Sequence, residues 1–265
     1  MTNRFFLRKF LCGLSIIFNI SCTSMRSVEL DSELSPEQQS SPLEFSRNVD
    51  PFPVLDKNGT AYHTPFSGGF NVPRPQFVDI DGDSDLDLFL QEQTDKLTFF
   101  ENIGNSKEPI YSWNTDHYHD IPIGEWSRFF DFDSDGDLDL LTEEPFSYIK
   151  YFRNIGTATS AAFLAVSDSL RDIQDAPVFA DRQNIPSIND LDCDGNWDLF
   201  LGRVEGTITR LEVPNNQQKN RPVFQFVENN FQGIEILGQF GTLHGANSMT
   251  FADIDADGDL DFFWG

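Results

Sequence analysis

The chain has 265 residues, 27 of them phenylalanine, and a formal net charge of -25 at pH 7. This length is sufficient for a sizeable core, and phenylalanine side chains are well suited to fill the interfaces between sheets. The acidic balance argues against nucleic acid as a partner, because phosphates need a basic face, and against simple electrostatic binding to anionic lipid.

Residues 1–21 have the features of a secretory signal peptide. Basic residues precede an apolar run from Phe10 to Phe18, which is too short for a comfortable membrane span. The next residues, "NISC" from Asn19 to Cys22, resemble the bacterial lipobox, and this resemblance implies lipidation of Cys22. Lipoproteins usually carry an aliphatic residue where Asn19 stands, so signal cleavage without lipidation stays open. We expect an exported protein, lipid-anchored at the outer membrane or cell surface, or otherwise periplasmic or secreted.

Residues 22–44 are rich in Ser, Glu, Gln and Pro and contain few large apolar side chains. This composition predicts a flexible stalk, which carries a folded part over residues 45–265. The three cysteines do not form a disulfide framework, since Cys12 lies within the signal peptide and Cys22 is the lipidation candidate. We expect Cys193 to be unpaired.

Four acidic loops, at 79–87, 131–139, 190–198 and 253–261, dominate the folded part. Each has aspartate at positions 1, 3, 5 and 9, a spacing that repels itself unless a cation is present. Calcium accepts six to eight oxygen ligands, which carboxylates and a position-7 carbonyl can supply. The candidate ligand residues are Asp79, Asp81, Asp83, Asp85 and Asp87; Asp131, Asp133, Asp135, Asp137 and Asp139; Asp190, Asp192, Asp194, Asn196 and Asp198; and Asp253, Asp255, Asp257, Asp259 and Asp261.

These loops are not EF-hands. An EF-hand needs a bidentate glutamate at position 12, where this chain has Leu90, Thr142, Leu201 and Trp264. The flanking residues alternate or run apolar in short bursts, without the long 3.6-residue stripe of a helix. The sequence therefore predicts strand, metal loop, strand, with up to four calcium ions that are structural and not catalytic.

The segments after the loops also correspond to one another. "LTFFENIG" and "IKYFRNIG" place Asn102 and Asn154 at the same distance from the first aspartate of their loops, and each is followed by a glycine and another short apolar segment. Apolar residues recur at loop positions 2, 8 and 10, so we expect the carboxylates to point one way and these anchors another. Units with several short strands and intervening turns are typical of propeller blades.

The segments "FVDIDGDSDLDLFL" and "FADIDADGDLDFFWG" resemble the FG-GAP or VCBS-type repeat, the calcium-loop blade of integrin alpha-chain propellers and of many bacterial surface proteins. The resemblance implies an all-β β-propeller whose blades are stapled by calcium between their first two strands. Two departures stand out. Ser84 replaces the usual loop glycine, which predicts a strained backbone there, and Asn196 replaces the position-7 aspartate.

The last repeat has its loop but no counterpart of "TFFENIG". We therefore expect an incomplete propeller of about four blades, belonging to a larger ring. A complete four- or five-bladed ring is the alternative, in which residues 45–70, with their Asn58-Gly59 hairpin signal, supply the missing strands.

Catalytic motifs are sparse. His117 and His119 would lie on one side of a predicted strand as a weak zinc pair. The sequence favours a non-catalytic, calcium-stabilised binding or adhesion scaffold at the cell surface or in the periplasm, with an unknown protein or carbohydrate ligand. The alternative is a calcium-dependent polysaccharide lyase or hydrolase, which requires a base and a cationic cluster in one cavity. The basic residues available for that cluster are Arg128, Arg153, Arg182, Arg203 and Arg210.

Overall fold

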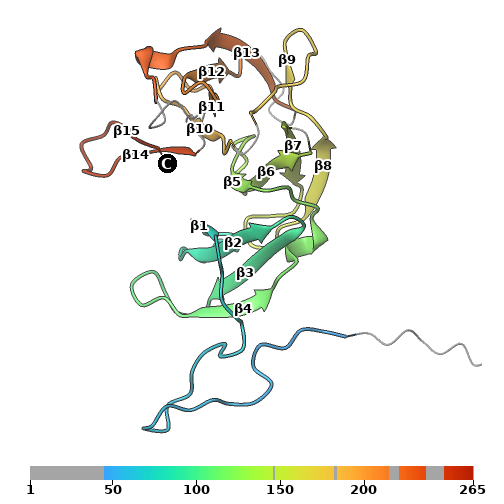
Figure 1. Ribbon diagram of the computed structural model, residues 1–265, viewed down its shortest axis with the longest axis vertical. Helices are drawn as coiled ribbons and strands as arrows, with labels where there is room; N and C mark the ends of the chain where they lie inside the picture. Colours follow the sequence, from blue (N-terminus) through green and yellow to red (C-terminus); the bar gives the residue numbers. More distant parts are fainter. Residues whose placement is uncertain (1–44, 146, 182–183, 215–220, 237–247, 265) are drawn as a thin grey trace, which may run out of the picture. The chain divides into compact units, whose positions relative to one another are not determined.

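A computed structural model describes residues 45–145, 147–181, 184–214, 221–236 and 248–264 (Figure 1). Over these residues the chain is all-β, as predicted, with two short 3-10 turns, η1 (Tyr118–Asp120) and η2 (Phe231–Gly233). Within the same residues no helix is long and apolar enough to cross a membrane. The predicted signal peptide, Cys22 and the stalk lie outside the described residues.

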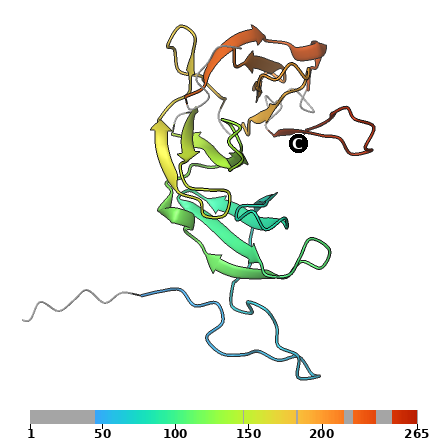
Figure 2. The ribbon, with the colours of Figure 1, turned by 180° about the vertical axis from the view of Figure 1, so that it is seen from behind.

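The strands form four separate sheets. The first contains β1 (Arg74–Val78), β2 (Asp87–Gln93), β3 (Lys96–Asn102) and β4 (Tyr111–Thr115), and the second contains β5 (Ser127–Phe130), β6 (Asp139–Glu144), β7 (Tyr148–Asn154) and β8 (Phe163–Ser167). The third contains β10 (Ser187–Asn189), β11 (Asp198–Gly202), β12 (Ile208–Glu212) and β13 (Val223–Glu228), with β9 (Arg171–Asp172) at its edge. The fourth is the hairpin of β14 (Met249–Ala252) and β15 (Asp261–Trp264), which carries its aspartate loop at the tip (Figure 2).

Strand β9 joins the chain of the second sheet to the third sheet. It follows β8 in sequence but pairs in parallel with β13, with Val223 opposite Arg171 and Phe224 opposite Asp172. The other strand pairs are antiparallel between neighbours in the sequence, as a meander requires. The β9 pairing therefore ties two successive sheets together through backbone hydrogen bonds.

The second strands of the second and third sheets are buried on both faces. In β6, Leu140 belongs to the apolar cluster shared with the first sheet, whereas Leu141 belongs to the cluster shared with the third. In β11, Leu199 and Phe200 divide in the same way between the second and fourth sheets. Successive side chains of a strand point to opposite faces, so a strand between two neighbours reads as a continuous apolar run. This explains the "DLDLL" and "DLFL" patterns that follow the loops.

The apolar loop anchors pack in two directions. At position 2, Ile80 is buried in the cluster between the first and second sheets, and Phe132 in the cluster between the second and third. At position 8, Leu138 and Trp197 pack against the cluster shared with the preceding sheet, and the Trp197 indole Nε1 donates to the Phe132 carbonyl at 3.0 Å. The second and third loops are therefore held between their two neighbouring sheets.

Three anchors depart from the predicted inward orientation. Leu86 of the first loop is 51% exposed, and Ile254 and Leu260 of the fourth are 71% and 37% exposed. In the described part of the chain, Leu86 has no preceding sheet and Ile254 no following one. These two anchors are exposed because a neighbouring sheet does not supply the other wall, whereas Leu260 is exposed although the third sheet precedes it.

The four sheets do not by themselves establish the predicted propeller ring. Among the described strand pairs, none joins the first sheet to the fourth. Residues 45–70 contain the predicted Asn58-Gly59 turn, closed by a bridge between Leu55 and Ala61, but add no strand to a sheet in the described chain. The all-β prediction is confirmed, and the propeller stays a prediction.

Candidate metal centres

All four aspartate loops join the first and second strands of a sheet in one register. In each, the residue before position 1 pairs with the residue at position 9, the pairs being Val78 with Asp87, Phe130 with Asp139, Asn189 with Asp198 and Ala252 with Asp261. The flanks are strands and not helices, so the predicted strand, loop, strand order is confirmed. Identical closure gives the four loops a common geometry.

The position-1 aspartate organises each loop by accepting hydrogen bonds from its backbone. Asp131 accepts from the amides of Asp135 and Gly136, both at 3.2 Å. Asp190 and Asp253 accept from the same two positions of their loops, at 3.0 to 3.1 Å. Asp79 accepts from positions 4 and 6, through Gly82 at 2.7 Å and Ser84 at 3.0 Å. This cradle fixes one carboxylate before any ion is considered.

Each loop turns through two left-handed residues. Position 6 has positive φ in all four, and Ser84 at φ 74° adopts the conformation that glycine provides elsewhere, as predicted. Position 4 is also left-handed, with Ser134 and Cys193 at 58° and Ala256 at 61°. The sequence did not indicate a left-handed backbone at position 4, because only the first loop has glycine there, as Gly82.

The turns bring the carboxylates of positions 1, 3 and 5 together. In every loop these three residues each offer a ligand oxygen within 4.8 Å of the others. The side chains at positions 7 and 9 do not belong to these groups. The groups are Asp79, Asp81 and Asp83; Asp131, Asp133 and Asp135; Asp190, Asp192 and Asp194; and Asp253, Asp255 and Asp257.

Buried oxygens without partners indicate that the first two loops fit a cation. Within the described chain, the Oδ1 atoms of Asp81, Asp85, Asp133 and Asp137 are buried and accept no hydrogen bond. Burial, with the charge of Asp83 next, raises the pKa of both Asp81 and Asp85. Burial, followed by the charge of Asp135, raises the pKa of Asp137 to about 6. Unpaired buried carboxylates are costly, and a hard divalent cation with oxygen ligands relieves that cost.

The position-9 aspartate acts as a bracket between the loop and its sheet. One oxygen of Asp139 accepts from the Phe132 amide at 3.2 Å and from the Tyr151 hydroxyl at 2.8 Å, and the other accepts from the Asn154 amide at 2.7 Å. Burial raises the pKa of Asp139 to about 6, and does the same for Asp87 in the first loop. These predicted ligands are occupied by hydrogen bonds, so their role in this structure is to hold the fold.

The position-7 residues close the loop through their backbone. The amides of Asp85, Asp137, Asn196 and Asp259 donate to the position-5 carboxylate at 2.8 to 3.2 Å. Asn196 adds its side-chain amide, which donates to the other oxygen of Asp194 at 2.8 Å. Here the substitution replaces a repelling charge with a hydrogen-bond donor.

Arginines enter the second and third loops from the third strand of their sheets. The Nε of Arg153 lies 2.6 Å from Asp133, and its Nη2 lies 3.3 Å from Asp135. Arg210 contacts Asp192 at 2.5 Å and Asp198 at 2.7 Å. These cations lie beside the residues predicted to bind calcium, and sequence reasoning missed them because the two partners are far apart in the chain.

The first loop has the opposite charge at the corresponding place. Glu101 precedes Asn102 as Arg153 precedes Asn154, and both lie on the third strand of their sheet, where they pair with the fourth strand in the same register. The charge of Glu101 contributes to the raised pKa of Asp81, after burial and the charges of Asp83 and Asp79. The sequence does contain a signal for this difference in charge beside the loops. The residue before the repeated asparagine is acidic in "ENIG" and basic in "RNIG".

The predicted histidine pair is wrong in its geometry. His117 precedes η1 and its Nδ1 lies 2.9 Å from Asp116, whereas His119 lies inside the turn at φ 52°, packed against Tyr118 and Phe163. The two are therefore not on one side of a strand. In the described chain, the metal-competent groups contain aspartates and no histidine.

The basic residues considered for a catalytic cluster lie at separate places. Arg153 and Arg210 belong to two different loops, and Arg203 pairs with Asp181 at 3.6 Å. Arg128 lines a pocket between strands, and Arg182 lies outside the described residues. Cys193 is a free, exposed cysteine, as predicted.

Comparison with known proteins identifies no relative of this chain. No protein-family description and no curated protein matches the sequence.

Proposed function

We propose that this protein is a non-catalytic binding or adhesion scaffold stabilised by calcium, built of FG-GAP or VCBS-type blades as part of a β-propeller. The observation that carries the proposal is the common geometry of four loops, each with three converging aspartates between paired strands. Calcium would be held by the carboxylates of positions 1, 3 and 5, and it would supply charge neutralisation and cross-linking. The exposed anchors Leu86 and Ile254 are what the ends of a stack of blades would present.

The separate placement of the arginines supports a scaffold over the polysaccharide-active alternative. A lyase or hydrolase needs a base and an electrophilic cluster that converge on one cavity. In the described residues, Arg153 and Arg210 instead neutralise loop aspartates. The partner would then be a protein or carbohydrate recognised by loops, and not a substrate.

We place the protein outside the cytoplasm, anchored through Cys22, from the sequence alone. A calcium staple suits that location, because extracellular calcium sites operate at about 0.1–1 mM. Incorporation of a fatty-acid label that disappears in Cys22→Ser is the expected result, and labelling that persists in the variant would contradict the anchor.

Calcium removal tests the scaffold directly. Binding to the folded state alone adds about 2.7 kcal/mol for each site at a calcium concentration 100 times Kd. We therefore expect excess EGTA to lower the melting temperature markedly, as followed by calorimetry. Asp131→Asn should reduce the calcium stoichiometry by one, because it keeps the size of a position-1 side chain and removes its charge. An unchanged melting curve in EGTA would sink the calcium proposal.

A further inference from the structure

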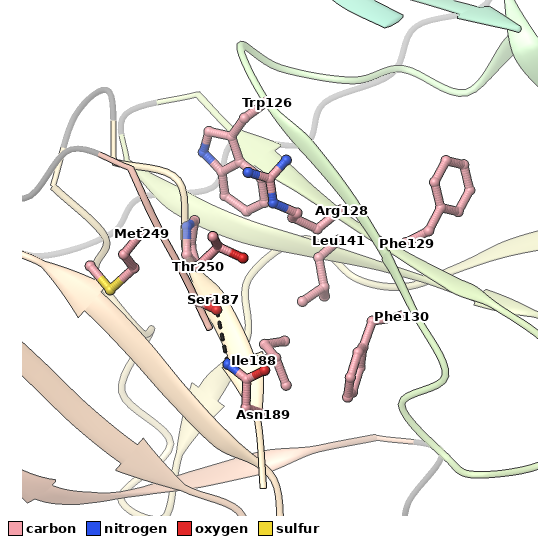
Figure 3. Close-up of a pocket in the computed structure, with 11 residues that line it drawn as sticks. Trp126, Arg128, Phe129, Phe130, Leu141, Ser187, Ile188, Asn189, Met249 and Thr250 are labelled. Atoms are coloured by element: carbon pink, nitrogen blue, oxygen red, sulfur yellow. Dashed lines mark hydrogen bonds between the residues drawn. The ribbon is translucent and has the colours of Figure 1, made fainter. Parts of the chain in front are cut away.

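A pocket lies between the first strands of three successive sheets, and its lining contains none of the loop aspartates. Its lining comes from β5 and β6 of the second sheet, β10 of the third and β14 of the fourth, with a volume of about 130 Å³. Trp126, Leu141, Ile188 and Met249 give it apolar walls (Figure 3). Pockets that enclose a drug-sized ligand measure about 300–1,000 Å³, so this one has room for a single chemical group.

Arg128 is the charged residue of this pocket, and no described carboxylate pairs with it. Its Nη1 donates to the carbonyl of Ser127 at 3.2 Å, which leaves its other donors available. Figure 3 shows the side chain extending toward Trp126 and Thr250. By contrast, Arg153, Arg203 and Arg210 each form an ion pair. Arg128 is thus a half-buried guanidinium without a carboxylate partner, set among the apolar walls of the pocket.

A second arginine reinforces the positive charge. Burial lowers the pKa of Arg128, and the charge of Arg74 on β1 lowers it further. Arg74 donates to the side-chain oxygen of Gln91 at 3.3 Å and has no ion pair in the described chain. The two cations repel each other, so an anion at Arg128 would relieve both desolvation and repulsion.

Hydroxyl groups also line the pocket. The buried Ser187 hydroxyl oxygen accepts from the Asn189 side-chain amide at 3.0 Å, so its own proton can be donated to a ligand. Thr250 contributes a second hydroxyl at the rim. One guanidinium and one or two hydroxyls match the acceptor oxygens of a single carboxylate.

We propose that this pocket binds a carboxylate carried on a short apolar stem, with Arg128 and Ser187 as its donors. The apolar walls favour such a stem over a sugar acid, whose ring hydroxyls would be buried without partners. The inference rests on the proposed binding function for its biological use, since it names the class of ligand group that the scaffold recognises. The binding chemistry itself does not involve the calcium loops.

The test is calorimetric titration of the full chain, saturated with calcium, with butyrate at low ionic strength. A ligand of this size should bind with a Kd of about 1 mM. Glucuronate and inorganic phosphate, titrated separately, should bind at least about tenfold more weakly, because neither combines one carboxylate with an apolar stem. Equal affinity for either competitor, or no butyrate binding by the folded chain at 50 times the expected Kd, would overturn the proposal.

Two substitutions of Arg128 separate binding from folding. Arg128→Gln should weaken butyrate binding at least about tenfold, whereas the control Arg171→Gln, on β9 and outside the pocket lining, should not change it. Arg128→Met should also abolish binding, yet raise the melting temperature without ligand, because it removes an unpaired charge from an apolar site. A merely structural arginine would lower the melting temperature in Arg128→Met, and this result would contradict the proposal. Loss of calcium stabilisation with butyrate binding retained would refute the calcium scaffold and leave the pocket standing.

Discussion

At the scale of single residues, the four loops differ in the charge that faces them. Arg153 and Arg210 pair with loop aspartates, whereas Glu101 adds negative charge beside the first loop. A cation already supplied by the chain competes with calcium for the same carboxylates, and an extra carboxylate favours calcium. The first loop should therefore bind calcium more tightly than the second, although their aspartates are identical in number and spacing.

Glu101→Gln and Arg153→Gln form a matched pair for this difference. Glu101→Gln should lower the calcium affinity of the first loop, and Arg153→Gln should raise the calcium affinity of the second loop, each by about three- to tenfold. The reason is that each substitution removes one unit charge near the divalent ion. Calcium titration followed by NMR at the amides of Ser84 and Gly136 reports each loop separately, since both donate to a position-1 aspartate. Shifts of the same sign in the two variants would contradict the prediction.

At the scale of elements, a polar turn links the third and fourth strands of the first two sheets. The Asn102 side-chain oxygen accepts from the amides of Gly104 and Ile110, at 3.1 and 2.9 Å, and Asn154 accepts from Gly156 and Ala162 in the same way. The backbone amide of each asparagine meanwhile donates to the position-9 aspartate. The "N-I-G" segment thus connects the metal loop to the far side of its sheet.

The glycine of this turn is required by close packing. A Cβ on Gly104 would overlap the Glu108 carbonyl and lie 2.7 Å from the Ile110 nitrogen, and one on Gly156 would overlap the Ser160 carbonyl. We expect Gly104→Ala to destabilise the protein by about 1–3 kcal/mol in chemical denaturation with calcium present, because backbone must move. Gly69→Ala is the control, since no atom lies within 4 Å of its Cβ position. Equal stability of the two variants would refute this account of the turn.

At the scale of the whole molecule, the apolar clusters between successive sheets stabilise the fold, whereas the charge repulsion within the acidic loops destabilises it. The clusters bury the strands between neighbours, whereas the aspartates hold like charges together. Several of these carboxylates have raised pKa values, so the metal-free fold favours protons at the loops. Protons and calcium should therefore be alternative means of neutralising the same groups.

The pH dependence should reverse sign with calcium. Asp87, Asp137 and Asp139 have pKa values raised from 3.8 to about 6. The folded state binds more protons than the unfolded state between these values, so their stabilisation is complete below 3.8 and is lost as pH rises through about 6. In EGTA the melting temperature should rise by several degrees from pH 8 to pH 5.5.

In saturating calcium the melting temperature should fall over the same pH range, because protonated carboxylates ligate poorly. Scanning calorimetry of one preparation under both conditions provides the comparison. Parallel pH profiles with and without calcium would show that these carboxylates are not neutralised by the ion.

The sequence by itself determined what depends on short stretches of chain. Aspartate spacing and the missing position-12 glutamate predicted loops between strands, and Ser84 revealed its left-handed backbone because a few bonds fix the turn. The tertiary structure decided which charges meet across distant segments: Arg153 reaches the second loop, while Arg128 has no carboxylate partner among the described residues. It also decided that Phe132 is buried and Ile254 exposed, although both hold position 2. Burial requires a neighbouring sheet as the opposite wall, and a local pattern of residues does not specify whether that wall is present.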